Sequence, residues 1–118
     1  MLAADDALLS MITIEHIDAV KRIDEISEAR GVDVAIIGPG DLATSFGLHG
    51  QVDHPDLQAA IREAERGILS SSMYLGGVAF SPEQANRMME FGYRVVFLGF
   101  DWSLLQRGIA AAVNGIGR

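Results

Sequence analysis

Short apolar segments alternate with longer amphipathic segments along the chain. The apolar segments are rich in β-branched residues and are bounded by turn-forming or acidic residues, which predicts strands at residues 8–15, 32–37, 74–80 and 94–98. Apolar positions near helical spacing, with charged residues between them, predict helices at residues 17–29, 55–71 and 82–91 and a last one from Asp101 through Val113. Residues 42–54 are predicted to form a loop.

The order of strand and helix repeats four times, which predicts an α/β fold. Strands that are apolar on both faces are typical of a parallel sheet covered by helices and built from right-handed crossovers. No linker or charge block divides the sequence, so we expect residues 1–118 to form a single domain. A complete (β/α)₈ barrel needs about 250 residues, so this chain is either a small complete fold or part of a larger one.

Composition and charge narrow the classes of function. The formal net charge of −7 argues against a nucleic-acid partner, because that interaction needs clustered Lys and Arg. The absence of cysteine excludes disulfides, thiolate metal sites and a Cys nucleophile. No apolar run reaches the ~18 residues of a membrane span and the first residues lack a basic region, so we expect no membrane partner and a cytoplasmic location.

Two carboxylates stand where predicted strands end. Glu15 closes the first strand, and Asp41 follows the second strand after Gly38-Pro39-Gly40. Neighbouring parallel strands lie ~4.8 Å apart, so these two acids would come close together at one edge of the sheet. Hard divalent cations are commonly held by one or two carboxylates, with water and substrate as the other ligands. The pair is therefore either a metal site or two acids that cap helices.

The turn formed by Gly38, Pro39, Gly40 and Asp41 is a second candidate feature. A sharp turn out of a strand exposes backbone N–H groups, which can hold a carboxylate or a phosphate. The same residue types are common in ordinary strand-ending turns, so the pattern alone does not identify a ligand.

Longer stretches of the chain resemble a known family. The segment IEHIDAVKRIDEISEARGVDVAIIGPGDLATSFG is similar to IET…GVDG…IGPADLSASLG of the HpcH/HpaI-type class II pyruvate aldolases. The likeness continues through HPDLQ at residues 54–58 and VFLGFD at residues 96–101, and so covers nearly the whole chain. It implies the C-terminal half of a TIM (β/α)₈ barrel, a parallel four-stranded (βα)₄ unit.

The resemblance implies a metal-dependent lyase. Glu15 and Asp41 match the two protein ligands of a Mg²⁺, Mn²⁺ or Co²⁺ ion that pyruvate chelates, and their separation in sequence fits the family. The backbone N–H groups of Gly40 and Asp41 match those that hold the pyruvate carboxylate, with Gly38 close by. The implied reaction is reversible aldol cleavage of a 4-hydroxy-2-oxo acid to pyruvate and an aldehyde.

Three positions of the implied substrate site need comment. Gly40 replaces the family's usual alanine, and Thr13 stands where many members have a glutamine that reaches the pyruvate carboxylate. Ala79 matches an apolar residue against the bound substrate, although packing inside a barrel explains it equally well.

The family's arginine that binds pyruvate and its acid–base histidine come from the first half of the barrel, and neither motif is found here. We therefore expect the chain alone to be inactive or incomplete. A citrate-lyase-beta-like acyl-CoA lyase and a non-catalytic half-barrel for binding or assembly are the alternatives. The family forms hexamers, so we expect a homo-oligomer in which the last helix packs on a neighbour through Leu104, Leu105 and Ile109.

The remaining conspicuous side chains are expected to have structural roles. His16 is predicted to cap a helix or lie at the surface, and His49 and His54 to lie in a loop. Trp102 is predicted to pack between helices or at an interface.

Overall fold

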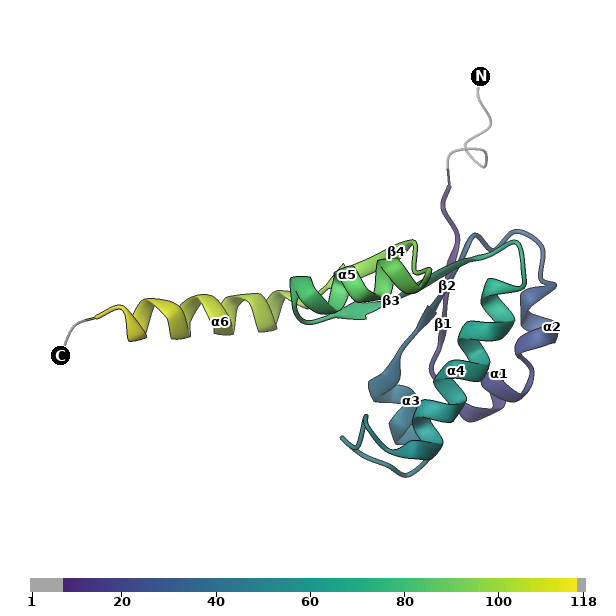
Figure 1. The fold of residues 1–118 in the computed structure, drawn as a ribbon, viewed down its shortest axis with the longest axis horizontal. Helices are drawn as coiled ribbons and strands as arrows, with labels where there is room; N and C mark the ends of the chain where they lie inside the picture. The colour runs from purple at the N-terminus through teal and green to yellow at the C-terminus, as the bar shows by residue number, and fades with distance from the viewer. Residues whose placement is uncertain (1–7, 117–118) are drawn as a thin grey trace, which may run out of the picture.

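The chain folds around one parallel sheet, as seen in a computed structural model that describes residues 8–116 (Figure 1). The four strands lie in the order β1-β2-β3-β4. Their bounds are β1 Met11–Ile14, β2 Val34–Ile37, β3 Tyr74–Ala79 and β4 Val95–Leu98. The helices are α1 Ile17–Lys21, α2 Ile23–Ser27, α3 Pro39–Ser45, α4 Pro55–Leu69, α5 Pro82–Phe91 and α6 Asp101–Asn114. The predicted α/β class and its four parallel strands are confirmed.

The first predicted helix is divided into two. The sequence predicted one helix at residues 17–29, but the backbone breaks at Arg22, which has φ −111° and ψ 23°. At this point the N–H of Arg22 donates to the carbonyl of Ala19, three residues back, at 3.2 Å. This tighter turn ends α1 and lets α2 begin at Ile23, which is 2% exposed and packs against Gly67 of α4.

A short helix occupies the start of the predicted loop. Pro39 is the first residue of α3, where its missing N–H costs no hydrogen bond. Leu42 and Ala43 are fully buried, so the apolar side of this seven-residue helix joins the core. A helix of this length has too few residues to show a period in sequence, which explains why a loop was predicted there.

Helix starts elsewhere follow the sequence signals. His54 and Ser81 are the N-caps of α4 and α5, each followed by proline at the first helical position. The N-cap of α6 is Phe100, and Asp101, where the sequence predicted the helix to begin, is its first residue. The Oγ of Ser103 there accepts from the N–H of Phe100 at 3.0 Å and donates to its carbonyl at 2.8 Å.

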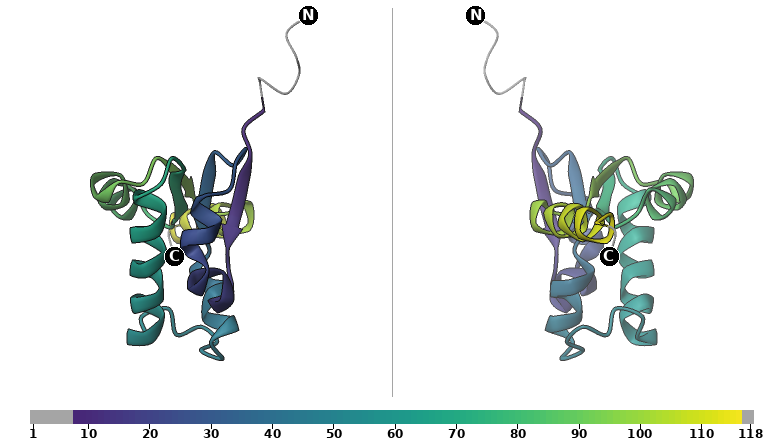
Figure 2. Two further views of the ribbon diagram at one scale, coloured as in Figure 1. Left: turned by 90° about the vertical axis from the view of Figure 1, so that its right-hand side faces the viewer. Right: turned by 90° about the vertical axis from the view of Figure 1, so that its left-hand side faces the viewer.

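The core lies on one face of the sheet, between the strands and the first four helices (Figure 2). The strand residues that enter it alternate along each strand, as the pleat requires. The buried strand members of this cluster are Ile14, Ala35, Ile37 and Leu75, and Ile12 and Val96 pack against it from part-exposed positions.

The opposite face of the sheet contributes nothing to that core, and we call it the open sheet face. It consists of the alternate strand residues Met11, Thr13, Val34, Ile36, Tyr74, Gly76, Val78, Val95 and Phe97. Phe97 is 43% exposed and Tyr74 is 57% exposed. An apolar sheet face of this kind, with an unpaired edge strand at each end, is a surface that normally associates.

The last helix extends away from the body of the protein (Figure 1). Ser103 is its one buried residue, whereas Trp102, Leu105 and Ile109 are more than half exposed. Arg107 ties the helix back to the sheet, because its Nη1 donates to the carbonyl of Phe80 at 3.0 Å. Within residues 8–116, none of the helices has both the length and the apolar composition that crossing a bilayer requires.

The contact between α2 and α4 gives a direct test of the packing. A Cβ added at Gly67 would lie 2.8 Å from two side-chain carbons of Ile23. We expect Gly67→Ala to destabilise the protein by about 1–3 kcal/mol through overpacking, despite the better helix propensity of alanine. Urea unfolding measures this difference. Gly108→Ala in α6 is the control, because no atom lies within 4 Å of its added Cβ. A Gly67→Ala variant as stable as the parent would contradict the packing.

Candidate metal centre

The position of Glu15 follows from the pairing of β1 with β2. Ile14 is in register with Ile37, and the N–H of Gly38 donates to the carbonyl of Ile14 at 3.2 Å. The next residue of each strand therefore continues the pairing, which puts Glu15 beside Gly38. Side chains alternate along a strand, so burial of Ile14 in the core turns Glu15 toward the open sheet face.

The side chain of Glu15 lies directly over the backbone of Gly38. A Cβ added at Gly38 would come 2.7 Å from Cγ and 2.9 Å from Oε1 of Glu15, closer than atoms can approach. Gly38 has φ −104°, which other residues adopt readily, so its backbone does not require glycine. The space that the Glu15 carboxylate fills is therefore the reason for glycine at this position.

Asp41 reaches the same strand ends on the first turn of α3. Gly38 is the N-cap of this helix, and Asp41 is its third residue. The N–H of Leu42 donates to the carbonyl of Gly38 at 3.0 Å, and the fully buried Leu42 side chain anchors the turn in the core. This anchoring leaves the Asp41 side chain exposed to solvent at the carboxyl end of β2.

Ser45 holds the two segments together and was not singled out in the sequence. Its Oγ accepts from the N–H of Ile17 at 3.1 Å and donates to the carbonyl of Leu42 at 2.7 Å. The chain that follows Glu15 is thus bonded to the helix that carries Asp41. A serine in a predicted loop carries no sequence signal for such a role, because its partner is 28 residues away.

The other predicted substrate-binding residues, Gly40, Thr13 and Ala79, differ in how exposed they are to solvent. Gly40 has no atom within 4 Å of the place where its Cβ would be, so the turn is open there. Thr13 is exposed on the open sheet face, two residues before Glu15 on the same side of the strand. Ala79 is fully buried at the end of β3, on the face that Leu75 and Gly77 share.

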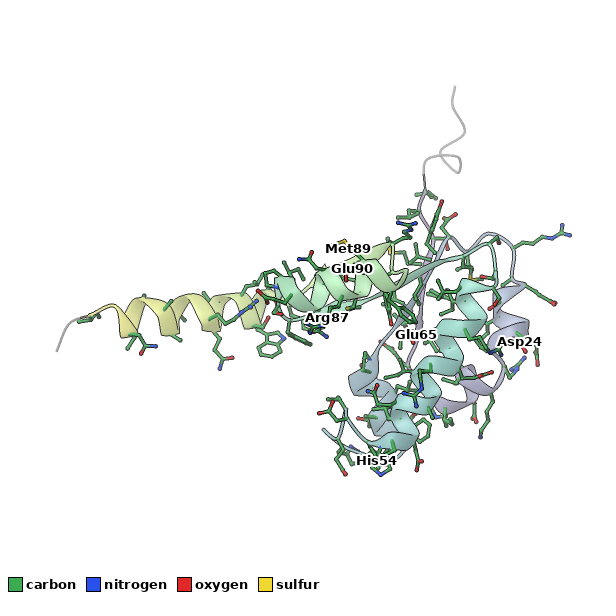
Figure 3. All side chains as sticks on the ribbon, viewed as in Figure 1. Asp24, His54, Glu65, Arg87, Met89 and Glu90 are labelled. Atoms are coloured by element: carbon green, nitrogen blue, oxygen red, sulfur yellow. The ribbon has the colours of Figure 1, made fainter. Side chains whose placement is uncertain are left out.

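The histidines take the structural positions expected of them. His16 is the N-cap of α1, and its Nδ1 accepts from the N–H of Asp18 at 3.2 Å. His54 caps α4 in the same manner at the end of that helix marked in Figure 3, and its Nδ1 lies 3.3 Å from the nitrogen of Asp56. His49 is exposed between α3 and α4.

The ligand atoms that Glu15 and Asp41 offer determine which kind of metal ion they could hold. Among residues 8–116, no three His, Cys, Asp or Glu side chains are grouped closely enough to form a complete metal cage. Two carboxylates with open space around them suit a hard cation such as Mg²⁺, which keeps several positions for water and substrate oxygens. The arrangement does not suit a closed structural zinc site, which needs four protein ligands.

The sequence of this chain is similar to those of known aldolases. The family model described as HpcH/HpaI aldolase/citrate lyase matches residues 3–107. A 4-hydroxy-2-oxo-heptane-1,7-dioate aldolase of Klebsiella pneumoniae is 36% identical over 108 residues, which are 92% of this chain and 41% of that protein. A hydroxypyruvate/pyruvate aldolase of Pseudomonas aeruginosa is 33% identical over 106 residues, covering 90% of this chain and 40% of its own length.

Solved structures of the same family have the same fold. An HpcH/HpaI aldolase from Desulfitobacterium hafniense superposes with a TM-score of 0.84 at 29% sequence identity, over 93% of this chain and 43% of that protein. A family protein from Burkholderia cenocepacia gives a TM-score of 0.84 at 28% identity, over 91% of this chain and 42% of that one. The chain thus spans about two fifths of the length of these relatives. Its sequence and fold together place it in the HpcH/HpaI aldolase/citrate lyase family.

Proposed function

We propose that this chain is the C-terminal half-barrel of a divalent-metal-dependent aldolase, a carbon–carbon lyase. In this proposal residues 1–118 are one domain, and Glu15 and Asp41 are the two protein ligands of a Mg²⁺, Mn²⁺ or Co²⁺ ion. The observation that carries the proposal is the close approach of Glu15 to Gly38, because it directs one carboxylate to the turn that bears the other. Membership of the family supports the same reaction class.

The proposed reaction cleaves a 4-hydroxy-2-oxo acid into pyruvate and an aldehyde. The bond between C3 and C4 breaks, the 4-hydroxyl group loses its proton and becomes the aldehyde carbonyl, and C3 takes up a proton to become the methyl group of pyruvate. A divalent ion supplies Lewis-acid chemistry when bound, which stabilises negative charge on the 2-oxo oxygen. No lysine adduct is needed, and the one lysine, Lys21, lies on α1 away from the strand ends.

The chain's own residues would bind and orient the pyruvate unit. The N–H groups of Gly40 and Asp41 belong to the first turn of α3, where helix N–H groups have no intrahelical partner and are free to donate to a carboxylate. Gly38 leaves room for the Glu15 side chain, which fills the space that a Cβ would take. In this proposal Thr13 faces the substrate from β1. Ala79, the predicted apolar neighbour of the substrate, is fully buried on the opposite face of the sheet with Leu75 and Gly77, so it supports the end of β3 from behind.

The proposal needs a second half-barrel for catalysis. The acid–base histidine and the pyruvate-binding arginine of the family are expected in that half, and general acid–base catalysis contributes about 10²–10⁴-fold to rates. The open sheet face and the two unpaired edge strands, β1 and β4, are the surfaces that it would cover. We also propose a homo-oligomer in which α6 packs on a neighbour, which its exposed Leu104, Leu105 and Ile109 support.

Two other functions are the alternatives to the proposed aldolase, and the experiments below distinguish them from it. A citrate-lyase-like enzyme would act on an acyl-CoA, and the family model spans both kinds of enzyme. A non-catalytic half-barrel would keep the fold and bind a ligand without turnover. The relatives reported above are named as aldolases, which supports the aldolase.

The metal proposal predicts a contrast between two glycines of one turn. Gly38→Ala would push the Glu15 carboxylate aside, so we expect its Mn²⁺ affinity to fall at least about tenfold, in the range measured for disturbed metal-ligand support. Gly40→Ala is the matched control, because its added Cβ meets no atom within 4 Å. Electron paramagnetic resonance of free Mn²⁺ measures both affinities. Equal affinities in the two variants would contradict the assignment of Glu15.

The reaction class predicts metal-dependent exchange of the methyl protons of pyruvate with solvent. We expect proton NMR in D₂O, with buffer as the base, to show exchange with Mg²⁺ and only background exchange in Asp41→Asn. Asp18→Asn is the control, because Asp18 is another exposed acid on the first turn of a short helix. Tight metal binding without any exchange would support the non-catalytic half-barrel instead.

The half-barrel proposal predicts association of the isolated chain. We expect light scattering to give a mass above that of the 12.7 kDa monomer, together with binding of an apolar dye. Phe97→Asp on the open sheet face should reduce both, whereas Phe91→Asp on α5, 56% exposed and outside that face, should not. A stable monomer that binds no dye would overturn the proposal.

A further inference from the structure

A cavity of about 460 Å³ opens beside Asp41. Its walls come from the start of α3, the segment before α4, the first half of α4, the end of β3, the start of α5 and the segment after β4, all within this chain. The volume lies within the range of about 300–1,000 Å³ that is usual for small-molecule sites. Asp41 and Gly40 form one wall, so a ligand held at the proposed metal site would have this space next to it.

Apolar and aromatic side chains make up most of the wall. Val52, Ile61 and Val78 line one side, and Phe80 and Phe100 line another. The two rings pack with centroids 5.9 Å apart and planes inclined by 57°. Phe80 is 48% exposed and Phe100 is 45% exposed, so both rings keep surface that a ligand can cover. Such a wall favours an aliphatic or aromatic group.

Two glutamine side chains hold the wall in place. The Oε1 of Gln84 accepts from the N–H of Phe80 at 2.9 Å, and the Nε2 of Gln58 donates to the carbonyl of Val52 at 2.8 Å. The backbone at both apolar walls is therefore fixed by side chains that themselves line the cavity. The wall thus combines residues from several helices and from β3 with the segment before α4, which Gln58 holds through Val52.

The charges at the cavity are all negative. Asp41 and Asp53 are its ionisable lining residues, and no Lys, Arg or His lines it within residues 8–116. Arg87 lies with Glu65 on an adjoining cavity of about 250 Å³ between α4 and α5, the helices on which Figure 3 marks them. Arg107 is engaged by the carbonyls of Phe80 and Ser103. The proposed metal ion and pyruvate carboxylate would occupy the end of the cavity at Gly40 and Asp41. A second negative charge elsewhere in the cavity would meet Asp53 and no cationic lining side chain within residues 8–116.

We propose that this cavity binds the uncharged, apolar tail of the aldehyde partner and selects against aldehydes that carry a carboxylate. This inference rests on the proposed function, because it takes Asp41 as the point where the reacting end of the substrate is held. Phe80 and Phe100 are its specificity-determining residues, and Asp53 excludes anionic tails. The substrate class is therefore 4-hydroxy-2-oxo monoacids with an apolar substituent at C4, in contrast to the heptane-1,7-dioate named for the Klebsiella pneumoniae relative.

The experiment measures binding to the chain with two unreactive alcohols in place of the aldehydes. Benzyl alcohol stands in for an apolar aldehyde and 4-hydroxybutanoate for an anionic one, since neither forms an adduct with Lys21. Titrations followed by ¹H–¹³C methyl NMR should shift the methyl signals of Val52, Ile61 and Val78 with benzyl alcohol and not with 4-hydroxybutanoate.

Substitutions separate the apolar wall from the charge. We expect Phe80→Ala to weaken benzyl alcohol binding about fivefold, because one aromatic contact is lost. Leu105→Ala on α6 is the control and should leave that binding unchanged, because Leu105 is 66% exposed and does not line the cavity. Asp53→Lys should improve 4-hydroxybutanoate binding about threefold, as expected for one exposed charge pair.

The outcomes distinguish this inference from the proposed function. Stronger binding of 4-hydroxybutanoate than of benzyl alcohol by the parent chain, or no methyl shifts with either alcohol, overturns the cavity assignment even if Mn²⁺ still binds. Benzyl alcohol binding that is as tight in Phe80→Ala as in the parent chain overturns the cavity assignment as well. Methyl shifts at Val52, Ile61 and Val78 support the cavity. Loss of Mn²⁺ binding in Asp41→Asn, but not in Phe80→Ala, supports the metal pair as a separate site.

Discussion

The parallel pairing of β1 with β2 is the constraint on which the proposed metal site depends. Because Ile14 pairs with Ile37, the next residues, Glu15 and Gly38, lie side by side, and the carboxylate takes the space of the missing Cβ. A slip of one residue would turn Glu15 into the core and Ile14 to the open face. The buried apolar side chains of both strands prevent that slip, so the same burial that stabilises the sheet also aims the carboxylate.

The sheet that positions this pair is itself only half closed. One face packs against helices, whereas on the open sheet face Met11, Tyr74 and Phe97 are exposed, although Val34 and Ile36 are buried. Both edge strands lack a partner strand on one side within residues 8–116. Parallel sheets are stable mainly when both faces are covered. In the proposed function, the protein combines a site that its own strands position with a sheet that a second half-barrel would cover. This separates ligand binding, which this chain is proposed to supply, from proton transfer, which it is not.

Much of the architecture was predictable because strong local signals agree with the final structure. The four apolar segments became strands, and His54-Pro55 and Ser81-Pro82 became helix starts. The break at Arg22 and the helix α3 were missed, since both are short features that tertiary contacts decide. Ser45 was missed for the same reason, because its hydrogen bond joins segments that are far apart in sequence. Metal and substrate roles of the site residues stay predictions.

The sequence by itself determined the order of strands and helices, the acidic charge and the two carboxylates at strand ends, because periodicity and composition are local properties. The tertiary structure decided what surrounds those carboxylates. Only the packed strands show that Glu15 fills the space above Gly38, and only the meeting of α3, α4, β3 and β4 creates a cavity beside Asp41. Close approach and enclosed volume depend on contacts between distant segments, and a linear pattern of residues does not contain them.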